Sequence, residues 1–149
     1  MNILVNAIGI TDSGGVTVLK KLMQELTASK QDEKFLFLFN ENEHISRIIE
    51  TYKKHNSFKF KFLSSKNFVY RFFFENVSLR KIIKRENINL IYNFSGSCQF
   101  FIKTPKIVKI QNLIFFSKEL DYLYWKKLKF LSWIKKIFIK RLIFKIMYT

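Results

Sequence analysis

The sequence predicts an α/β fold, a Rossmann-like parallel sheet of about five strands with helices on both faces. Short apolar runs alternate with segments of helical periodicity along the 149 residues, which is typical of a sheet built from strand–helix–strand units. The run from Phe35 to Phe39 is apolar at every position, as in a strand buried on both faces. With 48% hydrophobic residues, the chain is long enough for one domain over residues 1–149 with its own core.

The individual elements follow from the same periodicities. Lys59 and Lys61 alternate with phenylalanines, so we expect the third strand to show one face to water near a sheet edge. Helical spacing of apolar residues continues from Leu120 to the end of the chain. The expected strands are 2–7, 35–39, 58–63, 89–94 and 106–110, and the expected earlier helices are 15–29, 45 to about 55, and 67–87 as one helix or two short ones.

A glycine-containing loop between the first strand and the first helix is the first candidate site. Gly14 and Gly15 allow a ligand to approach the backbone closely, and a helix N-terminus there favours a phosphate group. The alternative is a tight turn that serves packing alone. Ligands of parallel sheets bind beyond the carboxyl ends of the strands. We therefore expect further substrate-cleft residues in this loop and in the loops after the fourth and fifth strands. These candidates are Asp12, Ser13, Ser95, Gly96, Gln111 and Asn112.

Composition limits the other classes of site. Cys98 is the single cysteine, which excludes an internal disulfide and a multi-cysteine zinc site and fits a reducing cytoplasm. His44 and His55 lack partners at ligand spacing, so we expect no metal. The N-terminus has no basic leader, and no apolar run is long and uncharged enough to span a membrane. We expect a cytoplasmic protein, with peripheral attachment to the inner face of the cytoplasmic membrane as an extension of that expectation.

The formal charge of +16 has two readings. It reflects either a proteome rich in lysine or an anionic partner. Nucleic acid is the less favoured partner, because the chain contains no recognisable nucleic-acid motif. Aromatic and basic residues mix in the last thirty residues, which suits an anionic membrane surface; the alternative is a helix packed on both sides. The residues of this expected membrane face are Lys126, Trp133, Lys136, Lys140 and Arg141.

Four stretches of the chain carry recognisable motifs: ILVNA at 3–7 with SGGVTVL at 13–19, YRFFFEN at 70–76, NLIYNFSG at 89–96 and TPKIVKIQNL at 104–113. Together these stretches resemble the N-terminal half of a GT-B glycosyltransferase of the family 4 type. The resemblance covers essentially the whole chain and lies in the order and spacing of the motifs. Arg71 and Glu75, in the second stretch, are spaced for an i, i+4 ion pair worth a few tenths of a kcal/mol, roughly.

The resemblance implies a transferase that moves a sugar from a nucleotide-sugar donor to a glycan or lipid-linked acceptor, usually with retention and without a metal or other cofactor. In such enzymes the N-terminal domain mainly binds the acceptor, and its glycine loop lies near the donor diphosphate. This chain has Gln111 where many relatives have a histidine, so a base at that position is not implied. The alternative function is a non-catalytic basic module that binds a membrane or nucleic acid.

The chain also departs from the family in length. The donor-binding C-terminal domain, with its carboxylate-bearing motif, is absent from the 149 residues. The helical pattern at Thr149 has no glycine cap or proline stop. We therefore expect a truncated chain that does not transfer sugar alone.

Overall fold

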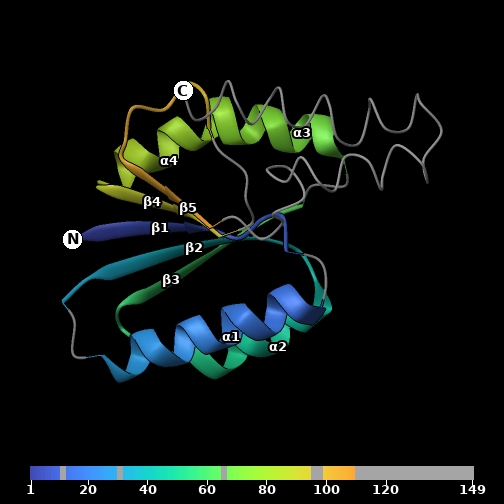
Figure 1. Ribbon diagram of the computed structural model, residues 1–149, viewed down its shortest axis with the longest axis vertical. Helices are drawn as coiled ribbons and strands as arrows, with labels where there is room; N and C mark the ends of the chain where they lie inside the picture. Colours follow the sequence, from blue (N-terminus) through green and yellow to red (C-terminus); the bar gives the residue numbers. More distant parts are fainter. Residues whose placement is uncertain (11–12, 30–31, 65–66, 95–98, 110–149) are drawn as a thin grey trace, which may run out of the picture. The chain divides into compact units, whose positions relative to one another are not determined.

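The predicted fold class is confirmed by a computed structural model, which describes residues 1–10, 13–29, 32–64, 67–94 and 99–109. Five parallel strands form one sheet in the order β3-β2-β1-β4-β5, and helices alternate with them along the chain (Figure 1). The strands are β1 (Asn2–Asn6), β2 (Lys34–Asn40), β3 (Phe58–Leu63), β4 (Leu90–Asn93) and β5 (Lys106–Val108).

Helices cover both faces of this sheet (Figure 1). On one face lie α1 (Ser13–Ala28) and α2 (Glu43–Tyr52), and on the other lie α3 (Phe68–Phe73), the π-helical turn η1 (Phe74–Ser78) and α4 (Leu79–Arg85). The predicted segment 67–87 is therefore helical, but one wider turn interrupts it. None of the described helices is long and apolar enough to cross a membrane.

Strand β2 supplies side chains to both layers of the core. Its residues Phe35, Phe37 and Phe39 pack under α1 and α2, while Leu36 and Leu38 face the layer under η1 and α4. All five are buried, so the continuous apolar run reports burial on both faces, as predicted. Strand β3 is an edge strand, and its alternation places Lys59 and Lys61 in register with Leu36 and Leu38.

Local sequence signals explain the helix ends. Asn42 caps α2, its side-chain Oδ1 accepting the His44 N–H at 2.9 Å. Asn87 follows α4 with φ 49°, a left-handed conformation that asparagine tolerates better than most residues. There the Ile88 N–H donates to the Ile83 carbonyl and the Asn87 N–H to the Lys84 carbonyl, the pair of bonds that defines a Schellman cap. This cap turns the chain into β4.

Candidate functional site

The candidate site lies where the strand order reverses, between β1 and β4. The chain builds β1, β2 and β3 outward in one direction and then returns to place β4 on the other side of β1. Asn6 and Asn93 are the last residues of these two strands and are partners in register. Both side chains are polar and yet fully buried. The strands that they end are otherwise mainly apolar. Open parallel sheets bind ligands beyond the carboxyl ends of the strands at such a reversal.

A buried hydrogen-bond network joins these two asparagines. Asn6 Nδ2 donates to Glu75 Oε1 at 2.8 Å and to Asn93 Oδ1 at 3.1 Å. Asn6 Oδ1 accepts the Ile8 N–H at 3.4 Å, at the start of the loop to α1. Asn93 and Gln99 form a reciprocal amide pair, with N–O distances of 3.2 and 2.9 Å. The network therefore connects the end of β1, the end of β4 and the chain beyond the next loop.

The π-helical turn η1 brings two consecutive side chains into this region. Glu75 and Asn76 are both buried, and the wider turn changes which positions of the helix face inward. Asn76 Nδ2 donates to the Phe72 carbonyl at 2.9 Å, and its Oδ1 accepts the Phe100 N–H at 2.8 Å. Glu75 Oε1 also lies 3.5 Å from Arg71 Nε. One turn of helix thus holds both the end of β1 and the segment after residue 98.

The role of this network is structural: its hydrogen bonds hold the ends of β1 and β4 in place. A carboxylate and three amides make mutual bonds in a buried setting, where a polar group without a partner would be costly. Among the described residues, the buried side-chain atom without a hydrogen-bond partner is His55 Nδ1, which follows α2 and lies outside the network. The same part of the chain contains no group of His, Cys, Asp and Glu that could hold a metal ion. The network holds the ends of β1 and β4 at Asn6 and Asn93, where the two following loops begin.

Three of the predicted site residues, Ser13, Gly14 and Gly15, lie at the start of α1. Gly14 and Gly15 lie in the first turn of α1, which begins at Ser13, two residues earlier than predicted. Gly14 is exposed and Gly15 is half-buried, so the backbone is accessible at the start of this helix. Outside the described residues are Asp12, Ser95, Gly96, Gln111 and Asn112, and also the expected membrane face of Lys126, Trp133, Lys136, Lys140 and Arg141.

Sequence reasoning missed the network itself. The Arg71–Glu75 ion pair is confirmed, but the Glu75 side chain is only 7% exposed, so the small energy expected for a surface pair does not apply to it. The available signal was an asparagine at the end of each of two apolar strands, each followed three residues later by a glycine. Periodicity alone did not indicate that Asn6, Asn93 and Glu75 would meet.

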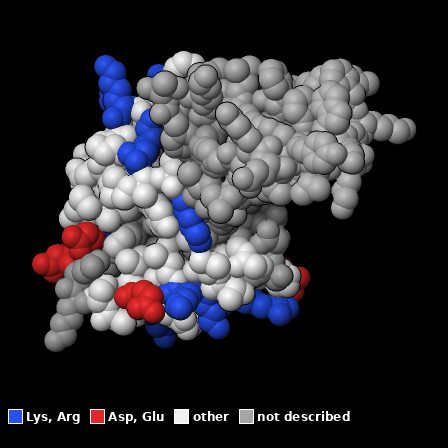
Figure 2. Space-filling model, viewed as in Figure 1, with Lys and Arg blue, Asp and Glu red and all other residues white. Residues whose placement is uncertain are grey.

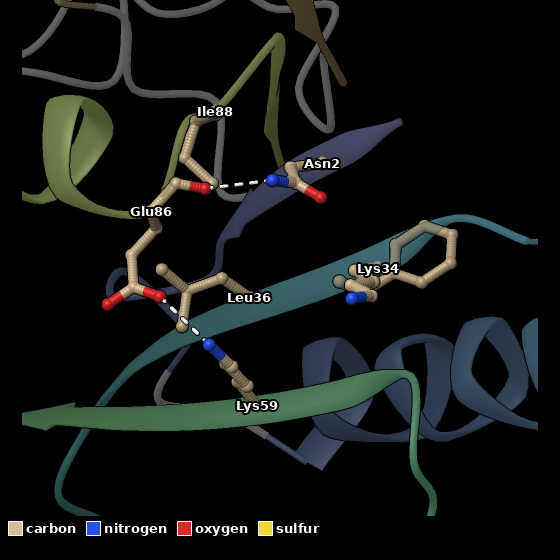
Figure 3. Close-up of a pocket in the computed structure, with 7 residues that line it drawn as sticks. Asn2, Lys34, Leu36, Lys59, Glu86 and Ile88 are labelled. Carbon is tan, nitrogen blue, oxygen red and sulfur yellow. Dashed lines mark hydrogen bonds and ion pairs between the residues drawn. The ribbon is translucent and has the colours of Figure 1, made fainter.

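A small pocket lies at the opposite, amino end of the sheet, where β1 begins (Figure 3). Its lining includes Asn2, Lys59 and Glu86. The Glu86 carboxylate is 3.1 Å from both Lys59 Nζ and Lys61 Nζ, and the Glu86 carbonyl accepts a bond from Asn2 Nδ2 at 2.9 Å. These contacts join α4 to the edge strand, and we interpret the pocket as a structural feature.

The ion pairs of Glu86 predict a pH dependence of stability. Hydrogen bonds from Lys61 and then Lys59 lower the pKa of Glu86 from 4.5 to about 2. Because the folded-state pKa is depressed, this stabilisation is present above pH 4.5 and is lost as pH falls toward 2. Solvent screening of the exposed Lys59 limits it to about 1 kcal/mol. Urea unfolding of the wild type and Glu86→Gln at about pH 6 and about pH 3 measures it; an equal acid-induced loss in both proteins would refute the assignment.

Comparison with known proteins adds no family assignment. No protein-family model, curated protein or solved structure matches the chain significantly. The features of the chain that bear on its function are therefore the fold, the network at the strand ends and the sequence motifs.

Proposed function

We propose that the chain is the acceptor-side, Rossmann-like domain of a glycosyltransferase-like protein in surface polysaccharide or glycoconjugate biosynthesis. The observation that supports this best is the buried bond between Asn6 and Asn93 at the reversal of strand order, where Asn6 also donates to Glu75. It fixes the starts of two loops at the edge where parallel α/β folds bind their ligands. This fold can host many functions, and the order of the four sequence motifs is what favours a glycosyltransferase among them.

In this proposal, the start of α1 faces the diphosphate of a nucleotide-sugar donor. The exposed Gly14 has no Cβ between the backbone and a ligand, and the first N–H groups of the 16-residue helix α1 point out of its N-terminus. These groups and the helix dipole favour an anion. The acceptor, a glycan or a lipid-linked sugar, lies in the same cleft, and the donor's other contacts come from a second domain.

Nucleotide binding tests this assignment without requiring sugar transfer by the 149 residues alone. We expect uridine or guanosine diphosphate, or its sugar ester, to give saturation-transfer NMR signals with the chain. Gly14→Val places a branched side chain at the proposed phosphate contact, and it should weaken binding by about tenfold or more, equivalent to about 1.4 kcal/mol.

The control is Ala28→Val, which makes a similar change at the exposed last residue of α1. It should leave nucleotide binding unchanged. If none of these nucleotides binds, or if both variants bind as well as the wild type, the donor-diphosphate role of the α1 start is wrong.

A further inference from the structure

An exposed apolar patch covers the outer side of α3 and η1. Among the described residues, ten large hydrophobic side chains are exposed, and six of these belong to this patch. Phe73 and Phe101 are 61% and 65% exposed, respectively. Soluble proteins rarely leave so much contiguous apolar surface uncovered, so such a patch indicates an interaction site. We define the apolar patch as Val69, Tyr70, Phe72, Phe73, Val77 and Phe101.

Ring contacts link the phenylalanines of the patch to one another through Phe100. Phe72 lies 6.3 Å from Phe73 and 6.1 Å from Phe100, measured between ring centroids. Phe100 in turn lies 6.3 Å from Phe101. Residues from α3 and from the segment before β5, far apart in the sequence, therefore form one aromatic surface. Val77 extends it by one turn into η1.

Basic side chains continue this surface along α4. Arg80 lies over the Phe101 ring, with its Cζ 5.9 Å from the ring centroid, and Lys81 and Lys84 are exposed on the same helix. Residues 68–85 contain one acid, Glu75, and it is buried. Over the face shown in Figure 2, lysine and arginine side chains are widely spread and the acidic ones gather in a few places. The apolar patch thus has a cationic border and no exposed acid along its helical segment.

We propose that the apolar patch docks on the surface of an anionic lipid bilayer. Aromatic rings and valines can enter the headgroup boundary while the neighbouring cations contact lipid phosphates. Charge argues against a second copy as the occupant, because each chain has a formal charge of +16. Single-stranded nucleic acid is less suited, because it requires stacking platforms along a basic groove, whereas Val69 and Val77 offer no ring. The proposal concerns a surface different from Lys126–Arg141 and does not depend on the proposed sugar transfer.

Vesicle co-sedimentation tests the patch. The full chain should bind vesicles of phosphatidylcholine with phosphatidylglycerol more strongly than vesicles of phosphatidylcholine alone, and added salt should weaken the binding. The variant Phe73→Gln/Val77→Gln should lower the partition coefficient at least about tenfold, because it removes two apolar side chains from the interface.

The matched control is Val18→Gln/Phe62→Gln, which removes one exposed valine and one exposed phenylalanine outside the patch. It should keep its partition coefficient within about twofold of the wild type. Unchanged binding in the patch variant, or an equal loss in the control, would overturn the proposal. A melting temperature several degrees lower in the patch variant alone would show that these side chains pack inside the protein, and would also overturn it. Loss of oligonucleotide binding with vesicle binding retained would assign the patch to nucleic acid instead.

Discussion

Replacing Phe37 with alanine is expected to lower the free energy of unfolding by about 3–5 kcal/mol, the usual cost of deleting a buried aromatic ring. Phe37 is fully buried in the middle of β2. Its ring lies 5.2 Å from that of Phe58 and 5.7 Å from that of Phe60 on the neighbouring strand. It also stacks on Phe39 at 5.9 Å. Because α1 and α2 close over these rings, the cavity left by the substitution cannot collapse completely.

Urea unfolding followed by circular dichroism measures this loss, with Phe62→Ala as the control. Phe62 lies on the same face of the sheet but is 45% exposed near the end of β3. Its replacement should cost about 1 kcal/mol or less. Domains of this kind are stable by only about 5–15 kcal/mol, so Phe37→Ala removes a large share of the total. Similar losses in the two variants would mean that β2 is not the centre of the core.

The success of the sequence prediction in this region has a simple physical cause. A strand buried on both faces must be apolar at every position, and residues 35–39 satisfy that condition without reference to any distant residue. The alternation of Lys59 and Lys61 with phenylalanines likewise reports the edge position of β3. Burial pattern is a local property of the sequence, so the strands and the fold class could be predicted from it.

The candidate site could be predicted only in part, because it depends on contacts between distant residues. Gly14 and Gly15, which predict a ligand contact at the start of α1, are a local signal in the sequence. Glu75, in contrast, bonds to a residue 69 positions away. The π-helical turn that holds Glu75 and Asn76, both buried, has no periodic signature in the sequence. The same turn separates the apolar patch on the outside from the polar network on the inside.

Glu75→Ala should destabilise the protein by about 3 kcal/mol, because it removes the acceptor of a buried hydrogen bond and the partner of a cation. Asn6 Nδ2 would lose its 2.8 Å bond, and Arg71 would lose its nearby carboxylate. Glu75→Gln keeps a side-chain oxygen that can accept from Asn6, so it should cost less, about 1 kcal/mol. Urea unfolding measures both variants.

Glu43→Ala provides the matched control, since Glu43 forms an i, i+4 pair with Arg47 on a helix surface where both side chains are at least 75% exposed. It should cost less than about 1 kcal/mol. In a double-mutant cycle, Asn6→Ala and Glu75→Ala should show a coupling energy of about 1–2 kcal/mol. Additivity within about 0.5 kcal/mol would mean that the two side chains do not act together. The bond between Asn6 and Glu75 is lost in full when either side chain is removed, so the second substitution costs less than it does alone. Strong coupling would therefore establish that the end of β1 and the start of η1 are held by one network.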